Sequence, residues 1–86
     1  MTFQIIWHEQ ATDGAVRFLK EDPDGLGRVF AAADLLAGEP RPEGSVALGS
    51  PDLRRLHAGP YRLMYQVEAA SATIVVLHIG RIPRPS

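Results

Sequence analysis

The last third of the chain constrains its fold most strongly, because three strand-like segments follow one another there with short turns between them. Residues 53–57 form a short segment, and Gly59 and Pro60 then supply a turn. Residues 61–68 alternate between apolar and polar side chains, and residues 73–79 are rich in β-branched side chains. This pattern predicts three consecutive strands of one sheet.

The middle strand, residues 61–68, indicates which side of the sheet is buried. Successive side chains of a strand point to opposite faces, so its apolar side chains share one face. These apolar residues are Tyr61, Leu63, Tyr65 and Val67. The opposite face carries Arg62, Met64, Gln66 and Glu68.

The first half of the chain predicts one more strand and two helices. Residues 2–7 alternate like a strand, and residues 9–21 repeat apolar side chains at helical spacing. Asp22 and Pro23 then end this helix and start a second one, which runs to about Ala37 before Gly38. Two helices joined so closely form an α-hairpin whose apolar stripes must pack against another part of the protein.

The remaining segments carry weak signals for regular structure. Residues 38–51 are rich in Gly and Pro and predict a mobile loop, and residues 82–86 predict a short tail. A chain of 86 residues without internal repeats is expected to form a single domain, residues 1–86. The predicted element order is strand, helix, helix, strand, strand, strand.

Composition excludes several classes of protein. The net charge of −1 argues against a general nucleic-acid binder, which depends on a clear cationic excess or a concentrated patch. The charge is segregated, since five of the eight arginines lie between residues 54 and 84 and eight of the ten acids precede residue 44. No cysteine is present, so disulfides and thiolate metal sites are excluded.

The sequence shows neither a signal peptide at its start nor an apolar run approaching the ~20 residues of a membrane span. We therefore expect a cytoplasmic protein with no membrane partner. The three histidines are scattered without the spacing of metal ligands, so no metal site is expected.

Two stretches carry a family resemblance that covers nearly the whole chain. RLHAGPYRLMYQV, residues 55–67, combines a basic–apolar–basic strand, a Gly turn and a Tyr-Arg motif. VVLHIGR, residues 75–81, is a hydrophobic strand that closes with Ile-Gly and a basic residue. With the preceding helices, these motifs resemble the RelE/ParE superfamily of bacterial type II toxins, and the RelE-like branch is favoured.

The resemblance implies an α+β fold with a small, mostly antiparallel sheet of about four strands and the α-hairpin packed on one face. It also implies a toxin that inhibits translation as a ribosome-dependent mRNA endoribonuclease. Its expected partners are a cognate antitoxin, in a hetero-oligomer, together with the ribosome and mRNA. No cofactor is implied. The alternatives are a ParE-like inhibitor of DNA gyrase, or an attenuated toxin that mainly binds its antitoxin.

The resemblance places catalytic residues at four positions that are predicted to share one sheet face: Arg55, His57, Arg62 and Arg81. Additional substrate contacts are expected from Arg54, Arg84 and His78. Cleavage without a metal uses the 2′-hydroxyl as internal nucleophile, so it needs cations on the phosphate and a group that transfers protons. Arginine stays protonated and suits the first role, and His57 is the natural candidate for the second.

The chain departs from the nuclease pattern in three places. Ile82 stands where a second basic residue is usual, no Tyr follows near the end of the chain, and His57 occupies a position where Lys or Arg is commoner. Without the resemblance, the arginines and His57 read as ordinary surface residues, and His78 reads as a packed strand histidine. These departures keep the gyrase inhibitor and the attenuated toxin open as alternatives.

Overall fold

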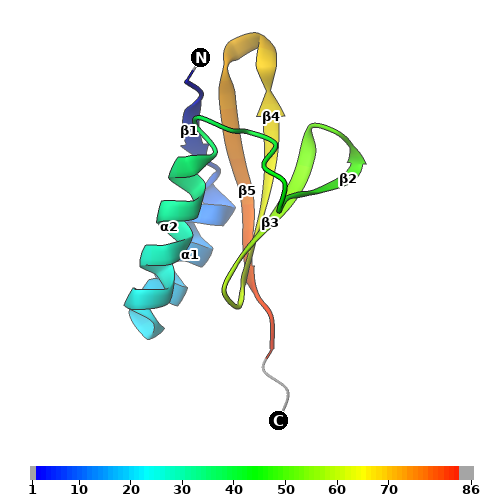
Figure 1. Cartoon of the computed structure of the whole chain (residues 1–86). Helices are drawn as coiled ribbons and strands as arrows, with labels where there is room; N and C mark the ends of the chain where they lie inside the picture. Colours follow the sequence, from blue (N-terminus) through cyan, green and yellow to red (C-terminus); the bar gives the residue numbers. More distant parts are fainter. Residues whose placement is uncertain (1, 84–86) are drawn as a thin grey trace.

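The computed structural model describes residues 2–83, which form two helices and a five-stranded sheet (Figure 1). The strands lie in the order β1-β5-β4-β3-β2; β1 runs parallel to β5 and the other neighbours are antiparallel. The elements are β1 (Gln4–Trp7), α1 (Glu9–Glu21), α2 (Pro23–Leu35), β2 (Val46–Ser50), β3 (Leu53–Ala58), β4 (Tyr61–Glu68), a 3₁₀ turn (Ala69–Ser71) and β5 (Thr73–Arg81). The predicted α+β class is confirmed, with five strands instead of about four. No helix in this part of the chain is long and apolar enough to cross a membrane.

The additional strand, β2, lies inside the segment that was predicted to be a loop, residues 38–51. It is mostly exposed and pairs with β3 along an irregular register that shifts between Ala47 and Ser50. Gly49 adopts a positive φ of 82° within this irregularity, a conformation that suits glycine. The strand forms because β3 offers it a partner edge, whereas its own sequence lacks the alternation of a half-buried strand.

Asp22 separates the two helices, as the sequence predicts. Its backbone N–H closes α1 on the carbonyl of Phe18 at 2.8 Å, and its side chain accepts a hydrogen bond from the N–H of Gly25 at 3.1 Å. Pro23 occupies the first turn of α2, where its missing N–H costs nothing. The helices consequently run in opposite directions, side by side (Figure 1).

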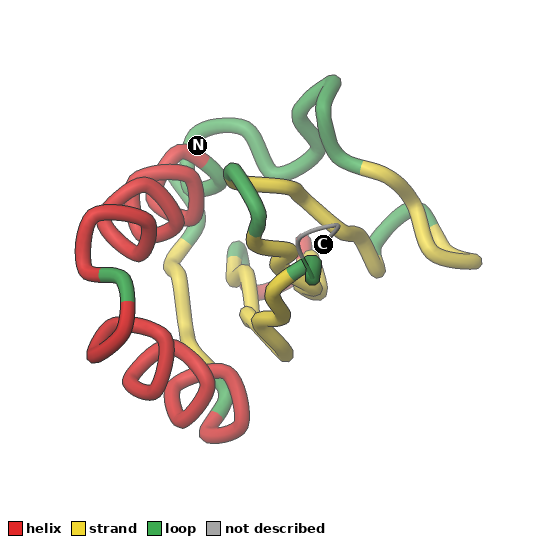
Figure 2. The backbone as a smooth tube through the Cα atoms, turned by 90° about the horizontal axis from the view of Figure 1, so that it is seen from below, coloured by secondary structure: helices red, strands yellow, loops and turns green. Residues whose placement is uncertain are grey.

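Both helices cover the same side of the sheet, as the view along the strands in Figure 2 shows. We call this side the helix face and the other side the open face. The predicted apolar face of β4 is buried on the helix face together with stripes from both helices. The fully or nearly fully buried side chains are Ala11, Ala15, Phe18, Leu26, Val29, Ala33, Leu36, Tyr61, Leu63, Tyr65, Val67, Ile74, Val76 and Ile79. Removing these apolar side chains from water makes the main favourable contribution to the free energy of folding.

A β-bulge in β5 changes which of its residues face the helices. Met64 pairs with His78, but the next residue of β4, Tyr65, pairs with Val76, so Leu77 has no partner of its own. Before the bulge, Val76 is buried on the helix face; after it, Ile79 takes that side. Because of the extra residue, His78 lies on the open face although Val76, two residues earlier, lies on the helix face.

Candidate functional site

The open face carries a shallow hollow of about 190 Å³ between four neighbouring strands. We call it the open-face hollow. Its lining combines two arginines and a histidine with small and apolar residues: Leu48, Arg55, Arg62, Met64, His78 and Gly80. It contains three of the seven residues that the sequence analysis proposed for the site.

Strand register explains why these cationic residues meet. Arg55, Met64 and His78 lie directly opposite one another across β3, β4 and β5. Arg62 precedes Met64 by two residues, so its side chain is on the same face and lies diagonally from both Arg55 and His78. Diagonal neighbours are about 7–8 Å apart, within reach of long side chains. Long side chains from these three positions can therefore reach the same hollow.

The two arginines of the hollow are available to a ligand. The Nε of Arg55 is buried and has no hydrogen-bond partner among residues 2–83. No carboxylate of these residues forms an ion pair with Arg55 or Arg62. The one acid on the same face of β4, Glu68, is six residues from Arg62, or about 20 Å along the strand. A buried donor without a partner is costly. Because no carboxylate among the described residues engages either guanidinium, the two arginines can bind an anion such as phosphate.

His57 lies near this hollow without lining it. It is directly opposite Arg62 in the register, as the predicted shared face requires. At this end of β3, beyond the pairing with β2, His57 is exposed and is one of the residues that line a different hollow of about 280 Å³. That hollow is mainly apolar and includes Leu35, Leu36 and Leu56.

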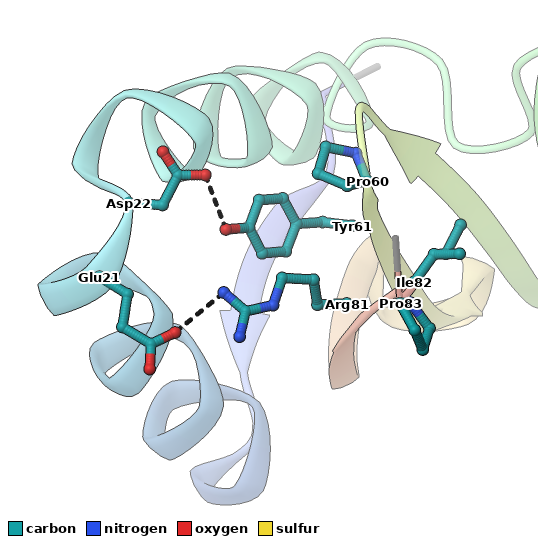
Figure 3. Close-up of a pocket in the computed structure, with 7 residues that line it drawn as sticks. All are labelled: Glu21, Asp22, Pro60, Tyr61, Arg81, Ile82 and Pro83. Atoms are coloured by element: carbon teal, nitrogen blue, oxygen red, sulfur yellow. Dashed lines mark hydrogen bonds and ion pairs between the residues drawn. The ribbon is translucent and has the colours of Figure 1, made fainter. Parts of the chain in front are cut away.

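Arg81 lies on the helix face, so the prediction that it shares one face with Arg55 and Arg62 is wrong. It pairs with the buried Tyr61 in the register, and its guanidinium forms an ion pair with Glu21 at 2.9 Å (Figure 3). The guanidinium carbon also stands 4.9 Å from the centre of the Phe18 ring. The Glu21 carboxylate and the Tyr61 hydroxyl raise the pKa of Arg81. These contacts connect the end of β5 to α1.

Tyr61 and Asp22 form a second polar contact beside Arg81. The Tyr61 hydroxyl donates a hydrogen bond of 2.8 Å to Asp22 Oδ2, which connects β4 to the junction of the helices (Figure 3). This hydrogen bond, with the one from the Gly25 N–H, lowers the pKa of the Asp22 carboxyl. Burial, followed by the hydrogen bond to Asp22, raises the pKa of Tyr61. A hollow of about 550 Å³ lies around these groups. Its four polar side chains are already paired, Tyr61 with Asp22 and Arg81 with Glu21.

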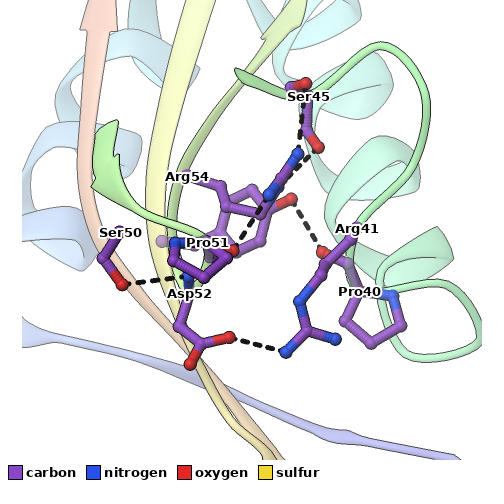
Figure 4. Close-up of polar contacts among 8 residues, drawn as sticks. Pro40, Arg41, Ser45, Ser50, Pro51, Asp52 and Arg54 are labelled. Atoms are coloured by element: carbon purple, nitrogen blue, oxygen red, sulfur yellow. Dashed lines mark hydrogen bonds and ion pairs between the residues drawn. The ribbon is translucent and has the colours of Figure 1, made fainter. Parts of the chain in front are cut away.

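Arg54 also faces away from the open-face hollow, and its guanidinium holds the loop that leads into β2. Its Nε donates to Ser45 Oγ at 2.8 Å, and a terminal nitrogen donates to the carbonyl of Pro51 at 2.9 Å (Figure 4). An ion pair of 2.6 Å between Arg41 and Asp52 fastens the same loop. The predicted substrate contact through Arg54 therefore competes with these bonds. Arg84, the other predicted contact, lies outside the described residues.

Several residues of the hollow carried a sequence signal that was not used. Met64 was placed on the correct face by alternation alone, and Gly80 was read only as the end of a strand. Leu48 had no usable signal, because it belongs to the strand that the sequence did not predict. For a metal ion, residues 2–83 offer no group of three or more His, Cys, Asp or Glu side chains.

Comparison with known proteins gives one family match and several structural matches. The model of a family described as ParE toxin of type II toxin-antitoxin system, parDE, matches residues 5–82. No curated protein sequence matches the chain significantly. The structure is similar to a chain of the archaeal RelE–RelB complex from Pyrococcus horikoshii OT3, with 26% identity and a TM-score of 0.79 over 99% of this chain and 100% of that one.

Two further structures share the fold at lower identity. A chain of the RelBE2 toxin–antitoxin complex from Mycobacterium tuberculosis is 21% identical, with a TM-score of 0.78 over 94% of this chain and 99% of that one. The isolated RelE toxin of E. coli is also 21% identical, with a TM-score of 0.74 over 98% of this chain and 88% of that one.

Proposed function

Because the chain belongs to the ParE toxin family of type II toxin–antitoxin systems, we propose that it is a toxin that cleaves messenger RNA on the ribosome, using its open-face hollow. The observation that carries this proposal is the pair of arginines, Arg55 and Arg62, that reach one hollow from neighbouring strands without a carboxylate partner among the described residues. The match to an archaeal RelE–RelB complex at 26% identity supports it.

The chemistry needs no metal ion. The 2′-oxygen of the RNA attacks the adjacent phosphorus, and the negative charge on the phosphate oxygens grows in the transition state. Arg55 and Arg62 bind those oxygens, because a guanidinium presents two parallel N–H donors that match a phosphate. The ribosome would present the RNA, which accounts for a nuclease with an overall charge of −1. This site of action places the protein in the cytoplasm.

A cognate antitoxin is the expected partner, in a toxin–antitoxin hetero-oligomer. The structures from P. horikoshii and M. tuberculosis that this fold matches are complexes of a toxin with an antitoxin. An antitoxin segment with acidic side chains fits the open face, where it would neutralise Arg55 and Arg62. Such a segment would block the hollow that we assign to RNA.

A second function, inhibition of DNA gyrase by protein contact or mere antitoxin binding, is favoured by one observation. Arg81 is turned to the helix face and held there by Glu21, and it is followed by Ile82 instead of a second basic residue. The open face therefore holds fewer cations than the sequence analysis expected. A surface that acts by contact alone would tolerate this loss.

Cleavage of a translated mRNA in a purified translation system separates the two functions. We expect the wild type to cut within the ribosomal A site, and the Arg62→Ala variant to cut about 10²-fold more slowly, because it lacks one donor to the phosphate. Arg28→Ala, which removes an exposed arginine of α2, is the matched control and should cut normally. Absence of cutting by the wild type, together with inhibited supercoiling by purified gyrase, would establish the second function instead.

A further inference from the structure

We infer that His78, and not His57, is the group that transfers a proton during RNA cleavage. This inference rests on the proposed function, because it assigns a residue to the same hollow. Of the two histidines, His78 lines the open-face hollow with Arg55 and Arg62, whereas His57 lines the mainly apolar hollow at the edge of β3. A proton-transfer group must lie within hydrogen-bond reach of the reacting oxygens, so its position decides first.

The β-bulge of β5 puts His78 in this position. Regular alternation from Ile74 and Val76, both buried on the helix face, would turn residue 78 into the core. The unpaired Leu77 reverses this, so that His78 is exposed on the open face and paired with Met64. Bulges commonly redirect a side chain beside a functional site. Here the redirected side chain is an imidazole, which can both accept and donate a proton.

The imidazole of His78 lies beside Gly80. A Cβ placed on Gly80 would lie 3.5 Å from His78 Nε2 and 3.9 Å from its Cδ2. The ring therefore leans along β5 toward Gly80, the residue that pairs with Arg62. This orientation directs Nε2 toward the row of Arg62, where a phosphate held by the two arginines would lie.

The proposed step moves one proton through His78 while one phosphorus–oxygen bond replaces another. Nε2 of neutral His78 accepts the proton of the 2′-hydroxyl while the 2′-oxygen forms its bond to phosphorus. The bond from phosphorus to the 5′-oxygen then breaks, and the leaving oxygen receives a proton from the imidazolium or from water. The products are a 2′,3′-cyclic phosphate and a 5′-hydroxyl. Arg55 and Arg62 remain protonated throughout and hold the phosphate oxygens.

Charged groups from three elements, β3, β4 and α1, lie near the imidazole. Arg55 of β3 and Arg62 of β4 line the same hollow as His78. His78 also lines a second hollow, of about 210 Å³, together with Asp13 and Arg17 of α1. The pH dependence of cleavage reflects all of these groups, so it must be compared between variants that change one histidine at a time.

The test is the single-turnover cleavage rate on ribosomes carrying a defined mRNA, measured against pH for the wild type, His78→Gln and His57→Gln. Both histidines are exposed, so both variants should fold, which thermal unfolding checks. We expect His78→Gln to lower the rate about 10²-fold and to remove the change in rate between about pH 5 and 8. His57→Gln should keep both the rate and its pH dependence. Added imidazole should partly restore cleavage by His78→Ala.

Each other outcome overturns the inference in a recognisable way. If the wild type cuts, Arg62→Ala is impaired and His78→Gln retains the full rate, the proposed function stands and His78 is not the proton-transfer group. The same conclusion follows if His78→Gln is slow but keeps the pH dependence of the wild type. If the wild type does not cut at all, the proposed function and this inference fail together.

Discussion

Asp22 is the residue that connects the most parts of the molecule. Its backbone ends α1, its Oδ1 caps α2, and its Oδ2 accepts the hydroxyl of Tyr61 from β4. Both side-chain bonds favour the ionised carboxylate, and together they lower its pKa in the folded protein. One acidic side chain thus links helix capping to the packing of the hairpin on the sheet.

The pH dependence of stability tests this role of Asp22. Because its pKa is lower in the folded than in the unfolded state, ionised Asp22 stabilises the fold at pH values above the ordinary aspartate pKa, and this contribution is lost as the pH falls through the lowered value. We expect Asp22→Asn to melt at a lower temperature than the wild type at pH 7, and the difference to shrink in acid. Asp24→Asn, an exposed acid of the same turn, is the control. A difference that stays constant down to about pH 2 would contradict the role.

Single residues also show why the site was only partly predictable from the sequence. Alternation along β4 placed Arg62 on the correct face, and spacing along β3 did the same for Arg55. Alternation failed in β5, because the bulge at Leu77 leaves no mark in a run of apolar and β-branched residues. That failure concerns both Arg81, which lies on the helix face, and His78, which lies on the open face.

At the scale of elements, the approach of α1 to β5 determines how the hairpin sits on the sheet. Gly14 lies where the helix meets Ile79, and a Cβ at this position would come within 2.8 Å of the Ile79 side chain. Glycine weakens an isolated helix, but the close approach of Ile79 requires it at this position. Gly27 of α2 has open space around its Cα, since nothing lies within 4 Å of a Cβ built there.

These two glycines predict opposite effects of the same substitution. Gly27→Ala should raise the free energy of unfolding by up to about 1 kcal/mol, because alanine favours the helix and meets no obstacle. Gly14→Ala should lower it, since the clash with Ile79 outweighs the same gain. Urea denaturation of the two variants measures both values. Equal stabilisation by both substitutions would show that α1 can withdraw from β5 without cost.

The elements also mark the limit of sequence-based prediction for the fold. The helices were predicted almost to their ends, because Asp22, Pro23 and the apolar stripes act locally. β2 was missed, because its exposed residues follow no alternation and its pairing with β3 is a tertiary interaction. Its absence from the prediction also removed Leu48 from the expected site.

At the scale of the whole molecule, the two faces of the sheet differ. Both helices cover one face and leave the other open (Figure 2). The helix face contains the core and the polar contacts that connect the hairpin to the sheet, including the ion pair between Arg81 and Glu21. The open face contains the hollow with Arg55, Arg62 and His78. This division places two nearby arginines, Arg62 and Arg81, on opposite faces of the sheet.

The separate roles of the two faces are best tested by measuring cleavage rate and thermal unfolding for Arg62→Ala and Arg81→Ala. Arg62 lies on the open face and Arg81 on the helix face, and both side chains are exposed. The two variants therefore remove the same side chain from opposite faces of the sheet. If the two faces have these separate roles, Arg62→Ala should cut about 10²-fold more slowly at an unchanged melting temperature. Arg81→Ala should lower the melting temperature, through loss of the Glu21 and Phe18 contacts, and should cut at nearly the wild-type rate. Full cleavage by Arg62→Ala, or a loss by Arg81→Ala at unchanged stability, would contradict these separate roles.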